Sequence, residues 1–152
     1  MDCKNEATPD PKALFASHSR NWRQNLYVYP VISRRSEGLS VGVNLNPDKA
    51  CNFDCVYCQV DRTISPVVRK VDVDVLRDEL DHMSALAVSG ELFDDVQFGH
   101  VPPTLRRFND IAFSGDGEPT TSPQFPAAVQ IATDVRRKYR LDDVKLVLIT
   151  DA

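Results

Sequence analysis

Three cysteines within eight residues constrain this chain more than any other feature of its sequence. Cys51, Cys55 and Cys58 follow the spacing CxxxCxxC in a chain of 152 residues that contains four cysteines. Cysteines this close together in a loop can turn their thiolates toward one point, as they do in zinc sites and iron–sulfur clusters. A closed site of either kind takes four protein ligands. Three thiols therefore predict a metal centre with one position open to a ligand that is not protein.

The motif resembles the signature of the radical S-adenosylmethionine (radical SAM) enzymes, because the aromatic Tyr57 stands just before the last cysteine. The resemblance implies that Cys51, Cys55 and Cys58 bind three irons of a 4Fe-4S cluster. It implies that the amino and carboxylate groups of S-adenosyl-L-methionine chelate the fourth iron, with Tyr57 beside the adenine. An external electron donor would reduce the cluster. The cofactor would then be cleaved to a 5′-deoxyadenosyl radical that abstracts a substrate hydrogen.

The residues around the motif resemble one subgroup of these enzymes, Fe-S oxidoreductases related to the wyosine-type tRNA-modifying proteins. The matching stretches are Ser33-Arg34-Arg35, Gly38 to Leu45, Cys55 to Gln59 and Arg62-Thr63, within a likeness that runs from about Ser33 to Thr150. The resemblance leaves the substrate unknown, with RNA as a candidate. The basic cluster at 136–138 is the best local candidate for contact with RNA, although a solvated helix end is the favoured explanation of it.

A second motif, Gly115-Asp116-Gly117-Glu118, follows the short apolar run at 111–113. Two glycines allow a ligand to approach the backbone closely. Taken alone, such a turn is typical of an ordinary strand-to-helix connection. In radical SAM proteins, however, a GGE-type stretch after the second strand binds the methionine amino group through backbone oxygens. The resemblance thus assigns these four residues to cofactor binding, with Asp116 in the place of the first glycine.

Hydrophobic spacing predicts the elements that carry both motifs. The predicted elements are a strand over 39–45, a helix from Asp72 or Asp74 to Gly90, a strand over 111–113, a helix beginning at Ser122 and Pro123, and a strand over 144–150. The first helix is expected to place Glu79 on its polar face. The last strand is nearly all apolar, so we expect it to be buried on both faces.

This order predicts an α/β fold with two βα units and a third parallel strand, joined by right-handed crossovers. The resemblance implies a partial, incomplete TIM-type βα barrel, of which residues 33–152 would form the N-terminal half. Residues 1–32 are expected to form an N-terminal extension. The C-terminal half of the barrel would be missing, and the third strand would present an unpaired apolar edge.

Composition sets the remaining expectations. The content of 42% hydrophobic and 26% charged residues is typical of globular proteins, and a net charge of -4 argues against a general nucleic-acid coat. Residues 1–10 lack the apolar core of a signal peptide, and no apolar run approaches the roughly 20 residues of a membrane span. We therefore expect no membrane partner and a reducing, cytoplasmic compartment, where clustered cysteines more often bind metal than form disulfides.

A non-catalytic metal-binding module is the alternative interpretation. Such a module would hold an Fe-S cluster or zinc, with Cys3 or a histidine as the fourth ligand. The two hypotheses differ in the metal itself, because stoichiometric zinc without sulfide would favour the module.

Overall fold

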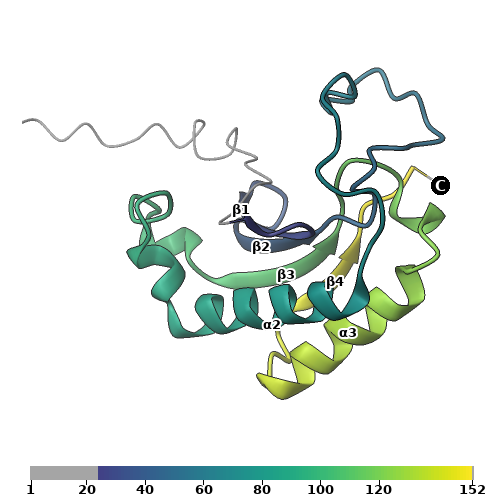
Figure 1. Cartoon of the computed structure of the whole chain (residues 1–152). Coiled ribbons are helices and arrows are strands. Elements are labelled where there is room, and N and C mark those ends of the chain that lie inside the picture. Colours follow the sequence, from purple (N-terminus) through teal and green to yellow (C-terminus); the bar gives the residue numbers. More distant parts are fainter. Residues whose placement is uncertain (1–23, 152) are drawn as a thin grey trace, which may run out of the picture.

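The structure, a computed structural model, describes residues 24–151. It has a mixed α/β fold in which two helices cover one face of a four-stranded sheet (Figure 1). The strands are β1 (Val28–Ser33), β2 (Gly38–Val43), β3 (Phe108–Phe113) and β4 (Lys145–Leu148), and the helices are α2 (Val73–Ser89) and α3 (Phe125–Lys138). Three short 3-10 helices lie in the connections: η2 (Glu91–Asp94), η3 (Pro103–Leu105) and η4 (Pro119–Thr121).

The sheet has the order β1-β2-β3-β4. β2, β3 and β4 are parallel neighbours joined through α2 and α3, which confirms the predicted α/β class with two βα units and a third parallel strand. β1 pairs with β2 in the antiparallel direction, with Val28 opposite Val43. Over residues 24–151 the sheet remains open and does not close into a barrel.

β1 begins within the segment that we assigned to an N-terminal extension. Its six residues pair along the whole of β2, so residues 28–32 belong to the sheet. Pro30 lies in the middle of the strand, opposite Val41. A proline is tolerated there because β1 is an edge strand, where an unpaired backbone position does not interrupt the sheet.

α2 begins and ends where its sequence predicts. The Asp72 carboxylate accepts hydrogen bonds from the N–H groups of Asp74 and Val75, as an N-cap does. Gly90 follows the last turn with a φ of 82°, a left-handed conformation that glycine adopts without steric cost. No helix within residues 24–151 has the length and apolar character needed to cross a membrane.

α3 begins later than predicted. Ser122 ends η4, since its N–H donates to the carbonyl oxygen of Pro119. Its hydroxyl accepts a hydrogen bond from the N–H of Gln124 at 3.3 Å, but the first helical residue is Phe125. The short 3-10 turn before the helix therefore displaces the first helical residue from Pro123 to Phe125, by two residues.

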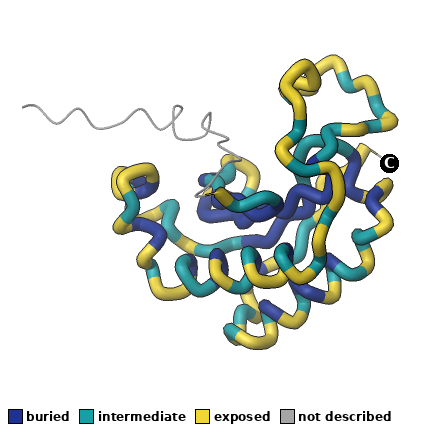
Figure 2. Tube along the Cα trace, in the orientation of Figure 1, coloured by how far each residue is buried: buried dark blue, intermediate teal, exposed yellow. Residues whose placement is uncertain are grey.

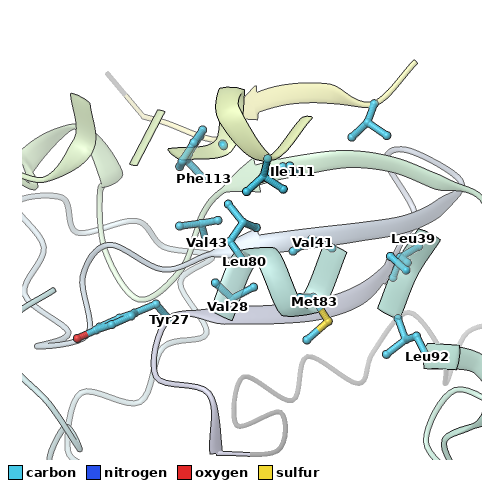
Figure 3. Packing of buried hydrophobic residues seen from close by; sticks show 14 of the residues in the cluster. Tyr27, Val28, Leu39, Val41, Val43, Leu80, Met83, Leu92, Ile111 and Phe113 are labelled. Carbon is cyan, nitrogen blue, oxygen red and sulfur yellow. The ribbon is translucent and has the colours of Figure 1, made fainter. Parts of the chain in front are cut away.

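The hydrophobic core lies between the sheet and the helices (Figure 2). Leu80 and Met83 of α2 pack among strand residues that include Val28 and Val41 (Figure 3). Burying each such side chain contributes about 1.5–3 kcal/mol. Successive residues of a strand point to opposite faces of the sheet. Ser40 and Gly42, which alternate with the core residues of β2, therefore lie on the face that no described helix covers.

β4 is less buried than predicted. Leu148 at its end and the adjacent Ile149 are 40% and 47% exposed, and no residue of the strand is fully buried. The expected burial on both faces is wrong because β4 pairs only with β3, so nothing within the described residues covers its outer edge. The expected unpaired apolar edge is confirmed for this part of the chain.

Candidate functional site

The residues that the sequence assigned to a site lie around one cavity of about 500 Å³. Its lining includes Cys51, Cys55, Tyr57, Cys58, Gly115, Asp116, Gly117 and Glu118. The cysteines lie in the long loop after β2, which stands above the ends of β3 and β4, and the glycine turn follows β3 (Figure 1). Loops that follow parallel strands meet at the same edge of a sheet. The topology therefore brings together two motifs that are far apart in the sequence.

The three cysteines of the loop are free thiols. The Cys55 thiol donates a hydrogen bond to Asp151 (2.7 Å), and Cys58 Sγ accepts one from Arg62 (3.6 Å). Within residues 24–151, no three His, Cys, Asp or Glu side chains stand in a metal-binding arrangement. The thiols thus border one cavity, and they must turn toward a common point to share a metal.

The donor set of the cavity fits an iron–sulfur cluster better than it fits a hard metal ion. Thiolates are soft ligands that suit iron–sulfur clusters and zinc. Cys51, Cys55 and Cys58 are the free cysteines of residues 24–151, so this part of the chain offers three thiols and no fourth. A cavity of about 500 Å³ also lies within the usual range of small-molecule sites.

Asp151 joins the cysteine loop to the segment after β4. The hydrogen bond to Asp151 raises the pKa of the Cys55 thiol, and the same bond lowers the pKa of Asp151. The Tyr57 hydroxyl also donates to Asp151, at 2.6 Å, and this bond raises the pKa of Tyr57. Because thiolates are the form that binds metals, Cys55 would have to lose its proton and leave Asp151 in order to bind one.

Asn44 fixes the glycine turn to the end of β2. Its side-chain oxygen accepts a hydrogen bond from the Asp116 N–H at 3.1 Å, and its amide donates to the Asp116 carboxylate at 2.8 Å. A Cβ atom on Gly115 would lie 2.3 Å from the Asn44 side-chain oxygen, so a glycine is needed for this approach. Asp116 therefore has a positioning role that a glycine in its place could not fill.

Arg62 connects the cysteine loop to the same turn. Its guanidinium donates to the carbonyl oxygen of Asp116 at 2.9 Å and to the carbonyl oxygen of Lys49. The other end of the guanidinium contacts Cys58 Sγ. Arg62 thus contacts both motifs. In the glycine turn it contacts the backbone oxygen of Asp116, and backbone oxygens of this turn are the groups that the resemblance assigns to binding the cofactor's amino group.

Gly117 packs directly against the start of the cysteine loop. A Cβ atom at this position would lie 2.3 Å from the carbonyl oxygen of Ala50 and 2.8 Å from Asn46 Cβ. We expect Gly117→Ala to lower the free energy of unfolding by about 1–3 kcal/mol, because the Ala50 carbonyl group and the Asn46 side chain must move away. Urea denaturation with an unchanged m-value measures this loss.

Gly99→Ala is the matched control for Gly117→Ala. The nearest atom to a Cβ at Gly99 is the carbonyl oxygen of Asp95 at 3.2 Å, so only a small adjustment is needed. Equal shifts of the urea midpoint in the two variants would contradict the close packing of the glycine turn against the cysteine loop.

Glu118 ties the glycine turn to the end of β4. The side chain is 4% exposed and accepts hydrogen bonds from the hydroxyls of Thr150 (2.6 Å) and Thr120 (2.7 Å) and from the N–H of Asp151 (3.0 Å). Its backbone oxygen accepts from Thr121 at 2.7 Å. The carboxylate therefore serves the fold, and the expected role of the turn in binding a cofactor would rest on its backbone.

The pKa of Glu118 predicts how the stability of the fold depends on pH. Burial raises this pKa, but the hydrogen bonds from Thr150 and Asp151 outweigh burial and hold the pKa below its usual value of 4.5. Because the pKa is lower in the folded state, the ionised carboxylate stabilises the fold above its unfolded pKa, and this contribution is lost as the pH falls through the folded pKa. We expect Glu118→Gln to cost about 1–3 kcal/mol at neutral pH.

Urea denaturation of both proteins at about pH 7 and about pH 3 tests this expectation. The difference between the parent and Glu118→Gln is expected to shrink in acid. A difference that stays constant between the two pH values would show that the charge of Glu118 contributes nothing to folding.

Two residues that line the cavity, Tyr29 and Asp151, were not predicted from the sequence. Asp151 lies just beyond β4 with no motif around it, and Tyr29 belongs to a strand that contains a proline. The Tyr29 hydroxyl donates to the carbonyl oxygen of Ser114 at 2.9 Å, just before the glycine turn. Its ring lies over Gly42, where a Cβ would be 2.1 Å from a ring carbon. Neither contact has a local sequence signal, because each partner is distant in the chain.

The fold and the cavity together define a mixed α/β protein with a three-cysteine pocket at the carboxyl ends of its parallel strands. In comparisons with known proteins, the chain is 29% identical over 123 residues to UPF0026 protein MJ1312 of Methanocaldococcus jannaschii. The match covers 81% of this chain and 32% of that protein, so the chain spans about a third of the relative's length. No protein-family model matches the chain. No solved structure matches it.

Proposed function

We propose that this chain is the cluster-binding part of a radical SAM enzyme. The observation that supports the proposal is the convergence of two motifs on one cavity: the CxxxCxxC loop after β2 and the glycine turn after β3 both line it. The parallel topology brings the two loops to one edge of the sheet. What supports the proposal is the pair of groups found there, three thiols beside a turn whose glycines leave its backbone open to close approach.

In this proposal Cys51, Cys55 and Cys58 hold a 4Fe-4S cluster, and S-adenosyl-L-methionine takes its open iron. When bound, the reduced cluster supplies an electron to the cofactor, which carries the radical chemistry. The chain's own residues bind and orient these groups. The glycine turn offers its backbone to the cofactor's amino group, with Asn44 fixing the position of Asp116.

Tyr57 and Arg62 would complete the cofactor site. Tyr57 lines the cavity beside the cysteines, where its ring can pack against an adenine. Arg62 contacts Cys58 Sγ and the carbonyl oxygen of Asp116, so it would place a positive charge beside the cluster ligands and the glycine turn. Hydrogen bonds to cluster sulfurs are one of the factors that set the reduction potential.

The partial TIM-type barrel is part of the same proposal. Helices on one face of the parallel strands, and a site at their carboxyl ends, suit a βα barrel. Further parallel strands would continue the sheet beyond the apolar edge of β4. The substrate stays unidentified, with RNA a candidate through the subgroup resemblance alone. An external donor would supply the electron, and a reducing compartment such as the cytoplasm would preserve the thiols.

The metal content of the protein tests the proposal. We expect anaerobic reconstitution with iron and sulfide to load about four irons and four sulfides per chain. Protein purified with stoichiometric zinc, which takes up no iron or sulfide on reconstitution, would overturn the proposal in favour of a zinc-binding module. Iron and acid-labile sulfide assays, together with elemental analysis for zinc, distinguish the two results.

A further inference from the structure

The loop that carries the cysteines is long. It runs from residue 44, after β2, to residue 72, before α2, and this part of the chain, which the structure describes in full, contains no helix or strand. Connections longer than about 12–15 residues are uncommon in compact domains, and they tend to be functional or disordered. Ordering such a loop around a metal costs conformational entropy. A contact that already closes the loop would reduce this cost.

Lys49 closes the base of the loop from one side. Its ammonium group donates hydrogen bonds to the carbonyl oxygens of Asp61 and Ile64, each at 3.1 Å. The Asp61 carboxylate accepts hydrogen bonds from the N–H (2.9 Å) and the hydroxyl (2.6 Å) of Thr63, and these bonds fix the turn that carries the two carbonyl groups. Residues 49 and 61–64 are therefore joined, although the whole cysteine motif lies between them in the sequence.

Arg62 closes the same base from the other side. Its guanidinium donates to the carbonyl oxygen of Lys49, so the side chain of each residue contacts the backbone at or beside the other. The guanidinium also donates to the carbonyl oxygen of Asp116 at 2.9 Å and contacts Cys58 Sγ at 3.6 Å. We call Lys49 and Arg62 the loop clasp. The loop clasp closes a ring of backbone that contains all three cysteines, and it ties this ring to the glycine turn.

The backbone of Lys49 adopts a conformation that is unfavourable for a residue with a side chain. Its φ of 60° lies in the left-handed region, which glycine adopts without steric cost. Such conformations persist only where the surrounding structure holds them, and they gather at ligand-binding sites. The Lys49 N–H donates to the carbonyl oxygen of Asn46 at 2.9 Å, and the Lys49 carbonyl oxygen accepts from Arg62. Both backbone groups of Lys49 are therefore held.

We propose that Lys49 and Arg62 are positioning residues that hold the cysteine loop closed, so that its three thiols can share one metal centre and retain it. The cysteines bind the metal, and the loop clasp reduces the entropy that they lose in doing so. Arg62 also fixes the loop relative to the glycine turn, which lines the same cavity. The inference rests on the proposed function only for the identity of the metal centre. The loop clasp itself can be tested on the metal-free chain.

Limited proteolysis of the metal-free full chain measures whether the loop is held closed. The Tyr57 side chain is 70% exposed, so chymotrypsin can cut after it when the loop opens. We expect this cut to be several-fold faster in Arg62→Gln and in Lys49→Met, because each variant loses hydrogen bonds from a charged donor. Mass spectrometry identifies the fragments. An equal acceleration of cleavage after the buried Phe113 would show a loss of stability alone and would overturn the proposal.

Arg69→Gln and Lys70→Met are the matched controls. They make the same substitutions at two exposed residues farther along the same loop, beyond the ring that the loop clasp closes, and neither residue lines the cysteine cavity. Both controls are expected to be cut at the rate of the parent. Equal rates of cleavage after Tyr57 in Arg62→Gln and Arg69→Gln would overturn the role of Arg62. Lys49→Met and Lys70→Met test Lys49 in the same way.

Retention of the metal tests the positioning role. Reconstituted protein is mixed anaerobically with excess iron chelator, and the loss of the cluster's visible absorbance is followed with time. We expect Arg62→Gln to lose its iron about tenfold faster than the parent and Arg69→Gln, because the closed loop has lost charge-assisted hydrogen bonds. The variant that combines Lys49→Met with Arg62→Gln should lose iron at most about twice as fast as Arg62→Gln alone, since either change opens the same ring. Effects that multiply would show two independent contacts and contradict a single clasp.

Failure of the loop clasp is distinguishable from failure of the proposed function. Protein that loads iron and sulfide, but in which Arg62→Gln and Arg69→Gln are cut and lose iron at equal rates, would disprove only the loop clasp. Protein that binds zinc in place of a cluster, yet is cut faster after Tyr57 in both clasp variants, would disprove only the radical SAM assignment.

Discussion

Replacement of any one of Cys51, Cys55 and Cys58 by alanine is expected to abolish cluster binding, the largest effect that we predict for this chain. The described residues contain no other cysteine that could replace the lost ligand. A cluster held by two thiolates would expose two irons to solvent and to oxygen. We expect iron and sulfide to fall from about four each per chain to less than about one. Iron and sulfide assays after anaerobic reconstitution measure the change.

Cys58→Ala is the most informative of the three variants, because Cys58 is exposed and its loss should leave the fold intact. Cys3→Ala is the matched control. Cys3 lies outside the described residues, and the radical SAM hypothesis gives it no role, so the variant should keep its full metal content. Equal iron content in the parent and all three motif variants would refute the assignment of the ligands. Loss of metal in Cys3→Ala would favour the four-ligand module.

Glu79→Ala is expected to destabilise the fold more than any other single substitution outside the core. The Glu79 carboxylate accepts three hydrogen bonds from the backbone, from the N–H groups of Leu26 (2.6 Å), Tyr27 (2.9 Å) and Val28 (3.1 Å). Tyr27 and Val28 are buried, so their N–H groups would lose a charged acceptor that water cannot readily replace. We expect a loss of about 3–5 kcal/mol in the free energy of unfolding.

Urea denaturation of Glu79→Ala beside Asp78→Ala measures this effect. Asp78 precedes Glu79 on α2 but is exposed, so its removal is expected to change stability by less than about 0.5 kcal/mol. Glu79→Gln keeps a neutral acceptor and should fall between the two. If Glu79→Ala unfolds at the same urea concentration as Asp78→Ala, the contact between α2 and β1 does not stabilise the fold.

The elements that depend on local signals could be predicted from the sequence. Asp72 and Gly90 mark the ends of α2 because capping involves only neighbouring backbone groups. Glu79 was placed on the polar face of α2, and its role could not be foreseen because its partners lie more than fifty residues away. Residues 26–29 have the composition of a strand, but Pro30 obscured the continuation of β1 to Ser33. A proline within a strand is acceptable at an edge, and which strand is an edge depends on the whole sheet.

In the candidate site, too, the local motifs could be predicted from the sequence and the long-range contacts could not. The cysteine loop and the glycine turn could be expected to meet, because both follow parallel strands of one sheet. The contacts that fix them could not be expected. Asn44 and Asp116 are separated by 72 residues, and Cys55 and Asp151 by 96. Pairings of this kind depend on tertiary structure, and neither residue type by itself indicates its partner.

We propose that this chain binds an iron–sulfur cluster with an iron that is open to S-adenosyl-L-methionine. Electron paramagnetic resonance of the anaerobically reconstituted, dithionite-reduced chain, recorded with and without the cofactor, tests it most directly. We predict a cluster signal that changes when S-adenosyl-L-methionine is added, because the cofactor becomes a ligand of the fourth iron. A cluster signal that is identical with and without saturating cofactor, or no cluster signal at all, would contradict the claim.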